Sequence, residues 1–209
     1  MDIDFIERLE RRLLDDLPGQ KAQLIMANQA RKVMLEASNT YNEACVMILL
    51  FLKNKDWHLA LIERTAFNPN DPHSGQLSLP GGRMEESDQT HSDCALRELH
   101  EEIGVNPEDI GVIGELSSLF VHVSDYLIYP FIGFTEREPV FYPQPSEVQE
   151  VIEIPLEIIY KDKFRSKKDI PVRNMILKDM PYIKVGDRTL WGATAMILSE
   201  FAEIIKELS

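Results

Sequence analysis

The chain has 209 residues and a hydrophobic content of 44%, which fits one globular domain with extensions or at most two small domains. Its formal charge of -13 argues against a general nucleic-acid binder, because such proteins present a basic surface. The charge does not exclude a nucleotide substrate, since a divalent metal ion and a few local basic side chains can reverse the local field.

The apolar runs and the termini indicate where the protein resides. The amino terminus is charged and amphipathic, unlike a signal peptide, and the longest apolar run, residues 44–52, is too short to span a bilayer. The final Glu-Leu-Ser matches no retention or peroxisomal signal. The two cysteines, Cys45 and Cys94, indicate no disulfide framework. We therefore expect a cytoplasmic protein.

The first 42 residues are expected to form a helical extension packed on a domain that covers residues 43–209. Residues 2–16 show the spacing of an amphipathic helix, which Pro18-Gly19 ends. Residues 19–41 show no pattern that assigns them to an element.

The domain is predicted to begin with a hairpin. Residues 43–53 form an apolar run typical of a buried strand, and residues 57–64 return after a turn at Asn54-Lys55-Asp56. Residues 65–82 are rich in Asn, Pro, Asp, Ser and Gly, which predicts a long loop of the kind that often carries function.

A helix is predicted after this loop, capped by Asp88 or Thr90 and ended by Gly104. The later elements are strands at 111–123, 126–134 and 148–154, and a helix within 187–207 that starts near Thr189 or Trp191. This order predicts an α/β fold with a mixed sheet and helices on its faces.

The predicted helix carries a cluster of three carboxylates on one face. At about 100° per residue, Glu98, Glu101 and Glu102 fall within about 100° of one another, opposite an apolar face that can anchor to a core. Oxygen ligands at this spacing suit Mg²⁺ or Mn²⁺ with positions open for a phosphate. The alternative interpretation is an acidic surface in contact with solvent.

A pair of glycines, Gly81-Gly82, comes before this helix. Glycine lets the backbone pass close to a ligand or adopt positive φ, although the pair also fits a simple turn after Pro80. Its position before a helix rich in carboxylates favours a site.

These residues resemble the Nudix box, G-x5-E-x7-R-E-U-x-E-E-x-G-U, in which U is a bulky aliphatic residue. The matching positions are Gly82, Arg97, Glu98, Leu99, Glu101, Glu102, Gly104 and Val105. Two departures are visible: the gap from Gly82 to Arg97 is one residue longer, and the central Glu is absent, with Asp88 the nearest carboxylate.

The longer spacing from Gly82 to Arg97 is similar to the spacing in one branch of this family, the coenzyme A diphosphatases. Further segments look like those of that branch: residues 61–65, 73–82, 129–133, 147–148, 155–156 and 190–195. The resemblance implies a Nudix-type α/β/α sandwich with a mixed β-sheet. It also implies hydrolysis of the coenzyme A diphosphate to adenosine 3′,5′-bisphosphate and 4′-phosphopantetheine.

The resemblance implies roles for individual residues. Glu98, Glu101 and Glu102 would bind Mg²⁺ or Mn²⁺, and Arg97 would orient a catalytic carboxylate. The residue that takes the proton from water stays open among Glu101, Glu147 and Glu150. The expected substrate-binding residues are Arg64, His73, Gln76, Ser78, Gly81 and Gly82.

Two other functions remain in competition. One is a Nudix pyrophosphohydrolase that acts on ADP-ribose, NADH or nucleoside triphosphates. The other is a non-catalytic nucleotide-binding module, although such modules typically lose the box carboxylates. The expected partner is a small nucleotide, with no nucleic acid and no membrane, and a homodimer is one possible assembly.

Overall fold

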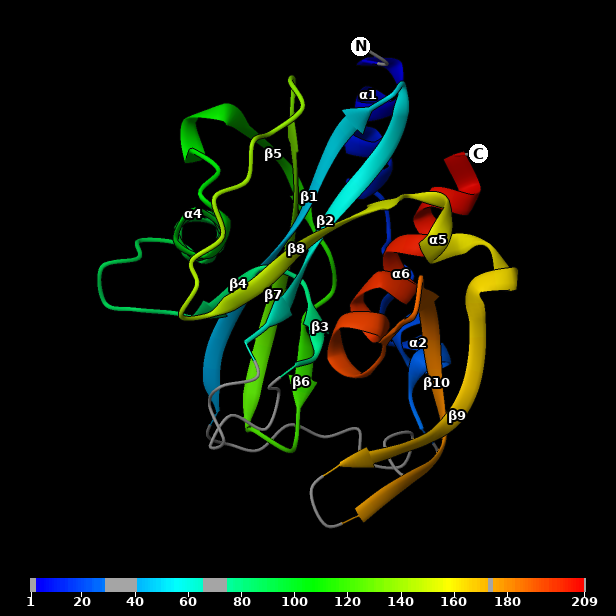
Figure 1. Ribbon diagram of the computed structural model, residues 1–209. Helices are drawn as coiled ribbons and strands as arrows, with labels where there is room; N and C mark the ends of the chain where they lie inside the picture. Colours follow the sequence, from blue (N-terminus) through cyan, green and yellow to red (C-terminus); the bar gives the residue numbers. More distant parts are fainter. Residues whose placement is uncertain (1–2, 29–40, 66–74, 173–174, 209) are drawn as a thin grey trace.

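The computed structural model describes residues 3–28, 41–65, 75–172 and 175–208 (Figure 1). Its main sheet is mixed. The parallel pair joins β1 (Asn42–Lys53) to β7 (Tyr126–Thr135), and the other pairs are antiparallel. On the outer side of β7 lie β5 (Ile110–Glu115) and β6 (Leu119–Val121). On the other side of β1 lies β2 (Asp56–Arg64), followed by β8 (Val148–Pro155).

The predicted hairpin of β1 and β2 is present, with a turn of two residues. Asn54 and Lys55 both have positive φ, of 52° and 72°, so the turn twists with the strands that it connects. The two strands pair only near this turn, from Leu50 opposite Leu59 to Lys53 opposite Asp56.

Two short strands fill the space where β1 and β2 separate. β4 (Gly81–Arg83) pairs with Ala44 to Val46 of β1, and β3 (Leu77–Ser78) pairs with Ile62 and Glu63 of β2. The sequence predicted one loop over residues 65–82, and this is wrong for its last part. The glycine pair is therefore held inside the main sheet.

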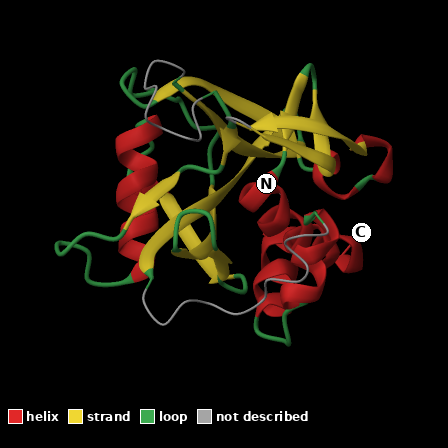
Figure 2. Ribbon diagram, turned by 90° about the horizontal axis from the view of Figure 1, so that it is seen from below, coloured by secondary structure: helices red, strands yellow, loops and turns green. Residues whose placement is uncertain are grey.

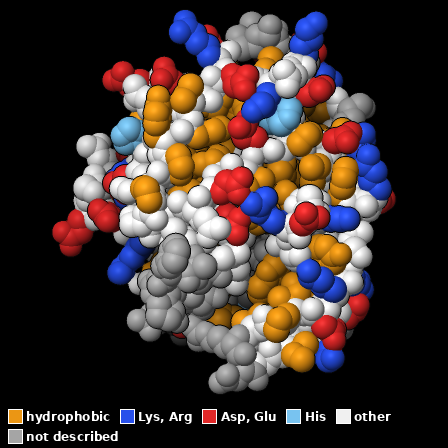
Figure 3. Space-filling view, viewed as in Figure 1, with side chains coloured by type: hydrophobic (Ala, Val, Ile, Leu, Met, Phe, Trp, Pro, Cys, Tyr) orange, Lys and Arg blue, Asp and Glu red, His pale blue; other side chains and the backbone are white. Residues whose placement is uncertain are grey.

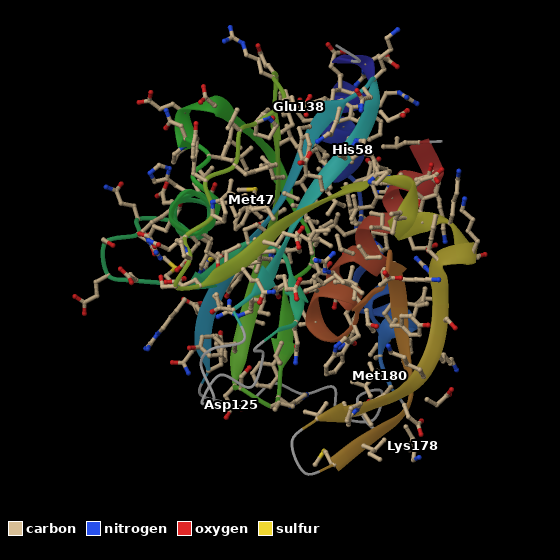
Figure 4. All side chains as sticks on the ribbon, viewed as in Figure 1. Met47, His58, Asp125, Glu138, Lys178 and Met180 are labelled. Carbon is tan, nitrogen blue, oxygen red and sulfur yellow. The ribbon has the colours of Figure 1, made fainter. Side chains whose placement is uncertain are left out.

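Side chains alternate along β1 and so form two cores. Cys45, Met47, Leu49 and Phe51 pack under α4 (His91–Ile103), and Figure 4 shows Met47 on that side. The intervening side chains of β1 belong to the other core, which α6 (Gly192–Leu208) covers. Figure 2 shows these layers side by side: one helix, the sheet, and a group of helices. The predicted α/β/α sandwich with a mixed sheet is thus confirmed.

A second sheet of three strands was not predicted. It consists of β9 (Arg165–Val172), β10 (Met175–Val185) and β11 (Arg188–Leu190), and it follows α5 (Glu157–Tyr160) and the 3₁₀ turn η3 (Asp162–Phe164). Figure 1 shows it beside α6, at the lower right. The sequence analysis assigned no element to residues 156–186.

Several predicted boundaries need correction. The strand predicted over 111–123 is two strands, β5 and β6, and the 3₁₀ turn η2 (Pro107–Asp109) comes before them. Of the two predicted starts of the last helix, the one near Trp191 is correct, because the helix begins at Gly192, whereas Thr189 lies in β11. Of the described helices, none has the length and apolar character that crossing a membrane requires.

The amino-terminal residues pack on α6. Helix α1 (Ile3–Leu13) buries Phe5, Ile6 and Leu9, and α2 (Gly19–Gln23) with the 3₁₀ turn η1 (Leu24–Met26) lies along α6. The observed helix α1 is shorter than the predicted 2–16. The division into an extension and a domain remains a prediction.

A buried carboxylate on α6, that of Glu200, joins the amino-terminal residues to the rest of the fold. It accepts hydrogen bonds from Gly19 N (3.0 Å), Ser117 N (3.3 Å) and Gln23 Nε2 (2.8 Å). Replacing this residue by Ala would leave one buried donor, Gln23, and two partly buried donors without their acceptor.

We expect Glu200→Ala to lower the free energy of unfolding by about 2–4 kcal/mol, measured by urea denaturation. Glu203→Ala on the same helix is the matched control. The Glu203 side chain is 34% exposed and pairs with Lys206 at the surface, so a change below about 0.5 kcal/mol is expected. Equal losses in the two variants would contradict the role of the buried network.

Candidate active site

Helix α4 is held in place at both ends. Thr90 is the N-cap: its hydroxyl accepts from Asp93 N (3.1 Å), and the Asp93 carboxylate accepts from Thr90 N (2.9 Å). Gly104 ends the helix in the left-handed conformation, as predicted, with φ 74° and its N–H bonded to His100 O. Of the two caps considered, Thr90 is therefore correct and Asp88 is wrong.

The glycine pair of β4 lies directly under this helix. Gly81 has φ +151°, and a Cβ at this position would lie 2.2 Å from Cys45 O on β1. A Cβ on Gly82 would lie 2.5 Å from the carboxylate of Glu98. Gly81 therefore requires glycine because of the neighbouring strand, whereas a side chain at position 82 would displace the Glu98 carboxylate.

Two helix carboxylates meet this strand. Glu102 is 1% exposed, and its Oε2 accepts a hydrogen bond from Gly81 N at 2.8 Å. Arg64 Nη1, at the end of β2, lies 3.6 Å from the other oxygen of Glu102. The Glu98 side chain is 13% exposed and lies against Gly82. The structure thus brings together five of the predicted site residues: Arg64, Gly81, Gly82, Glu98 and Glu102.

Arg97 ties the helix to the turn that precedes it. Its guanidinium makes two bonds of 2.9 Å to Asp88, and Nη1 lies 3.0 Å from both Glu98 and Glu101. It also donates to Arg83 O at 3.0 Å. Asp88 therefore pairs with the arginine of the Nudix-like pattern, in the region where that pattern places its missing Glu. The catalytic role of Arg97 remains a prediction.

The Asp88–Arg97 pair makes stability depend on pH. Hydrogen bonds from Arg97 lower the pKa of Asp88 to about 2, against a partial opposing effect of burial, whereas an unfolded Asp titrates near pH ~4. The pair therefore stabilises the fold fully above about pH 4, and this contribution is lost as the pH falls toward 2.

We expect Asp88→Asn to lower the free energy of unfolding by about 2 kcal/mol at pH 7. The gap from the unchanged protein should narrow as the pH falls from about 4 to about 2, as followed by urea denaturation at each pH. Glu86→Gln, an exposed carboxylate in the same turn, is the control. A gap that stays constant with pH would rule out the ion pair as its cause.

Two carboxylates of α4, those of Glu102 and Glu98, have raised pKa values. Burial raises the pKa of Glu102 to about 8, although Gly81 N–H and Arg64 favour its charged form. Burial also raises the pKa of Glu98, against the opposing effect of Arg97. The charge of Glu147 also contributes to raising both pKa values, so this residue lies within electrostatic range of the two carboxylates. Such mutual repulsion is relieved when a cation binds.

The residues fit a divalent cation only in part. Within the described ranges, no group of three or more His, Cys, Asp or Glu side chains is arranged to hold a metal ion. Mg²⁺, however, is commonly held by one or two carboxylates, with waters and substrate phosphates completing its shell. Glu98 and Glu102 offer such a pair, whereas Glu101 is 55% exposed and bound to Arg97. The ligand role of each residue remains a prediction.

The two later carboxylates considered as proton acceptors differ in their surroundings. Glu147, just before β8, acts electrostatically on Glu98 and Glu102. Glu150 instead forms an ion pair with Arg188 of β11, which also binds Glu63 at 2.9 Å. Arg188 was missed, because a lone arginine in a polar stretch gives no sequence signal. The electrostatic influence of Glu147 on Glu98 and Glu102, and the ion pair that Glu150 forms with Arg188, favour Glu147 over Glu150.

Three of the predicted substrate residues, Arg64, Gln76 and Ser78, lie around the ends of β2 and β3. Arg64 N donates to Gln76 O (3.1 Å), and Gln76 with Trp191 lines a cavity of about 200 Å³. The Ser78 hydroxyl is buried and has no hydrogen-bond partner among the described residues. His73 lies outside the described residues, so its predicted role stays a prediction.

Comparison with known proteins identifies the family of this arrangement. A family model described as the NUDIX domain matches residues 42–174. Nudix hydrolase 15, mitochondrial, from Arabidopsis thaliana is 34% identical over 172 residues, which are 78% of this chain and 59% of that protein. An uncharacterized Nudix hydrolase, NudL, from Pectobacterium atrosepticum is 30% identical over 131 residues, 62% of this chain and 67% of that protein. The chain thus spans less than two thirds of the length of the plant relative.

Solved structures agree on the fold. A Nudix hydrolase from M. smegmatis, RenU, has a TM-score of 0.53 at 15% identity, covering 80% of this chain and 88% of that one. A MutT/nudix family protein from Enterococcus faecalis has a TM-score of 0.55 at 16% identity, covering 92% and 76%. At these identities the likeness shows the fold alone.

Proposed function

The chain belongs to the Nudix hydrolase family, and from this premise we propose that it hydrolyses a nucleoside diphosphate linked to another group, with the help of a divalent metal ion. The observation that carries the proposal is the convergence of Glu98 and Glu102 on the backbone of Gly81-Gly82, beside Arg64. Carboxylates, a close backbone and a guanidinium are the groups that a metal-bound diphosphate needs.

The proposed roles follow from this geometry. A bound Mg²⁺ or Mn²⁺ would polarise the phosphate oxygens and lower the pKa of a bound water. Glu98 and Glu102 would hold the ion, and Gly82, which lacks a side chain, lets the diphosphate approach the backbone. Glu147 or Glu101 would accept a proton from the water that attacks phosphorus, while the bond from phosphorus to the bridging oxygen breaks.

We further propose coenzyme A or its derivatives as the substrate, with adenosine 3′,5′-bisphosphate and 4′-phosphopantetheine as products. The support is the resemblance of residues 61–65 and 73–82 to the coenzyme A diphosphatase branch, together with the longer spacing from Gly82 to Arg97. The start of the family model at residue 42 supports the proposed division into an extension, 1–42, and a domain, 43–209. A cytoplasmic location is also proposed, although two plant relatives are named mitochondrial and chloroplastic.

A product assay tests both parts of the proposal, the metal-dependent hydrolysis and the choice of coenzyme A as substrate. The purified chain would be incubated with Mg²⁺ or Mn²⁺ and, separately, coenzyme A, ADP-ribose, NADH and deoxynucleoside triphosphates. We expect the two named products from coenzyme A and slower turnover of the other substrates. Faster turnover of another substrate would overturn the coenzyme A assignment, and no turnover of any of them would favour the non-catalytic module.

A further inference from the structure

Two carboxylates lie directly opposite each other on neighbouring strands of the main sheet. Glu63 of β2 and Glu150 of β8 are partners in the antiparallel register of these strands, so their side chains lie on the same face. Like charges directly opposite each other destabilise strand pairing. A cation between the two carboxylates removes this repulsion.

The cation comes from the second sheet. Arg188 of β11 donates from Nε to Glu63 Oε2 at 2.9 Å and binds Glu150 through Nη2. Figure 3 shows acidic and basic side chains together near the centre of the visible face, in front of the main sheet. A guanidinium is planar and carries several donors, so it can bind two carboxylates at once. These three side chains form one ion-pair cluster that joins the two sheets.

The register of β2 and β8 changes immediately after this cluster. Arg64 lies opposite Val148 and not opposite Gln149, so the pairing is irregular between Glu63 and Arg64. An irregularity of this kind, such as a β-bulge, re-aims a side chain and is common beside active sites. The side chain at this irregularity is that of Arg64, whose Nη1 lies 3.6 Å from Glu102.

The next contacts connect the end of β2 to Glu147. Thr65 N donates to Glu147 O at 2.9 Å, and the Thr65 hydroxyl donates to Ser146 O at 3.1 Å. The ion-pair cluster thus lies at the last regular pair of the two strands, next to both Arg64 and the segment that carries Glu147.

We propose that Arg188 is a positioning residue: it holds β2 and β8 in the register that sets the places of Arg64 and Glu147 in the hydrolytic site. This inference rests on the proposed function. Arg188 bonds to none of the groups to which that function assigns a role. It also lies outside residues 42–174, the part of the chain that the family model matches. The second sheet therefore serves the site through this side chain.

The opposed carboxylates determine how the site responds when the guanidinium is removed. In Arg188→Gln they face each other without a cation, so their repulsion separates the strand ends. Replacing Glu63 by Gln as well removes the repulsion and leaves Glu150 opposite a neutral side chain. Activity that is lost in the single variant should return in the double variant, whereas a general loss of structure or of positive charge would not be repaired in this way.

Steady-state kinetics on coenzyme A with Mg²⁺ would test the proposal. We expect Arg188→Gln to lower kcat at least about tenfold with KM within about threefold, because slightly displaced groups still bind substrate but stabilise the transition state less. Arg188→Gln/Glu63→Gln should recover kcat to within about threefold of the unchanged chain. Arg188→Lys keeps the charge but lacks the planar fork, so an intermediate kcat is expected.

Lys184→Gln is the matched control, because it removes one positive charge from an exposed position on the neighbouring strand β10. Its kcat should stay within about twofold of the unchanged chain. Amide hydrogen exchange at Thr65 gives a readout that does not require activity. Exchange should be faster in Arg188→Gln and slow again in the double variant, and urea denaturation shows that each variant is folded.

Two results would overturn the proposal. One is a kcat in Arg188→Gln equal to that of the control. The other is a loss that the Glu63 substitution does not restore, because Arg188 would then act on the substrate and not through the opposed carboxylates. If the unchanged chain hydrolyses no substrate, the proposed function itself fails. Exchange at Thr65 then decides whether Arg188 holds the register: faster exchange in Arg188→Gln supports this role, and unchanged exchange contradicts it.

Discussion

Replacing Glu102 by Gln is expected to lower the metal-dependent turnover number at least about 10³-fold while the chain remains folded. The carboxylate is buried against Gly81, and Gln keeps an oxygen that can accept the Gly81 N–H bond. What is lost is the negative charge that would hold the cation. Because burial already raises the pKa of Glu102 to about 8, its charge does not stabilise the metal-free fold. At pH 7 the buried Glu102 is largely protonated in the folded chain and ionised in the unfolded one, so the free energy of unfolding should not fall in Glu102→Gln, and a rise is expected.

Steady-state kinetics on coenzyme A across a range of Mg²⁺ concentrations would measure this effect. Glu86→Gln removes an exposed carboxylate from the turn before α4 and serves as the control, with turnover expected to stay within about twofold. Glu101→Gln and Glu147→Gln, measured in parallel, would separate the two proposed proton acceptors. Unchanged turnover in Glu102→Gln would remove this carboxylate from the mechanism.

The parts of the fold that could be predicted are those with a strong local pattern. The apolar run of β1 and the capped, amphipathic α4 each carry enough residues to show their periodicity. β3 and β4 have two and three residues, too few for any period, and they exist only because β1 and β2 separate there. β9 is mostly exposed, so it lacks the alternation of apolar side chains that would have revealed it.

For the candidate site, the sequence could predict which helix face carries the carboxylates but not which partners their side chains bind. Helical spacing correctly placed Glu98 and Glu102 on the face that meets the glycines. It also grouped Glu101 with them, whereas the Glu101 carboxylate is bound by Arg97 and largely exposed. Spacing gives the direction of a Cα–Cβ bond, but the partners that a long side chain chooses depend on the tertiary structure. The pairing of Asp88 with Arg97 is another such choice.

Replacing each of the two neighbouring glycines by alanine should have a different main effect: on stability at Gly81 and on turnover at Gly82. In Gly81→Ala the new Cβ would lie 2.2 Å from Cys45 O and 2.6 Å from Val46 Cα, both backbone atoms of the buried strand β1. The backbone cannot give way cheaply, and φ of +151° is itself unfavourable for alanine. We expect a loss of more than about 4 kcal/mol in the free energy of unfolding, measured by urea denaturation.

In Gly82→Ala the new Cβ would meet only the carboxylate end of Glu98, at 2.5 Å, and a side chain can move. We therefore expect a loss of less than about 2 kcal/mol in stability but a fall of at least about 10²-fold in turnover, because the displaced carboxylate no longer faces the diphosphate. Gly186→Ala is the control for Gly81→Ala, since its φ of +57° also strains alanine but its Cβ would meet no atom within 4 Å. If Gly82→Ala keeps full turnover, catalysis does not require the Glu98 carboxylate to lie against the glycine backbone. Glu98 would then lose its support as one of the two proposed metal ligands.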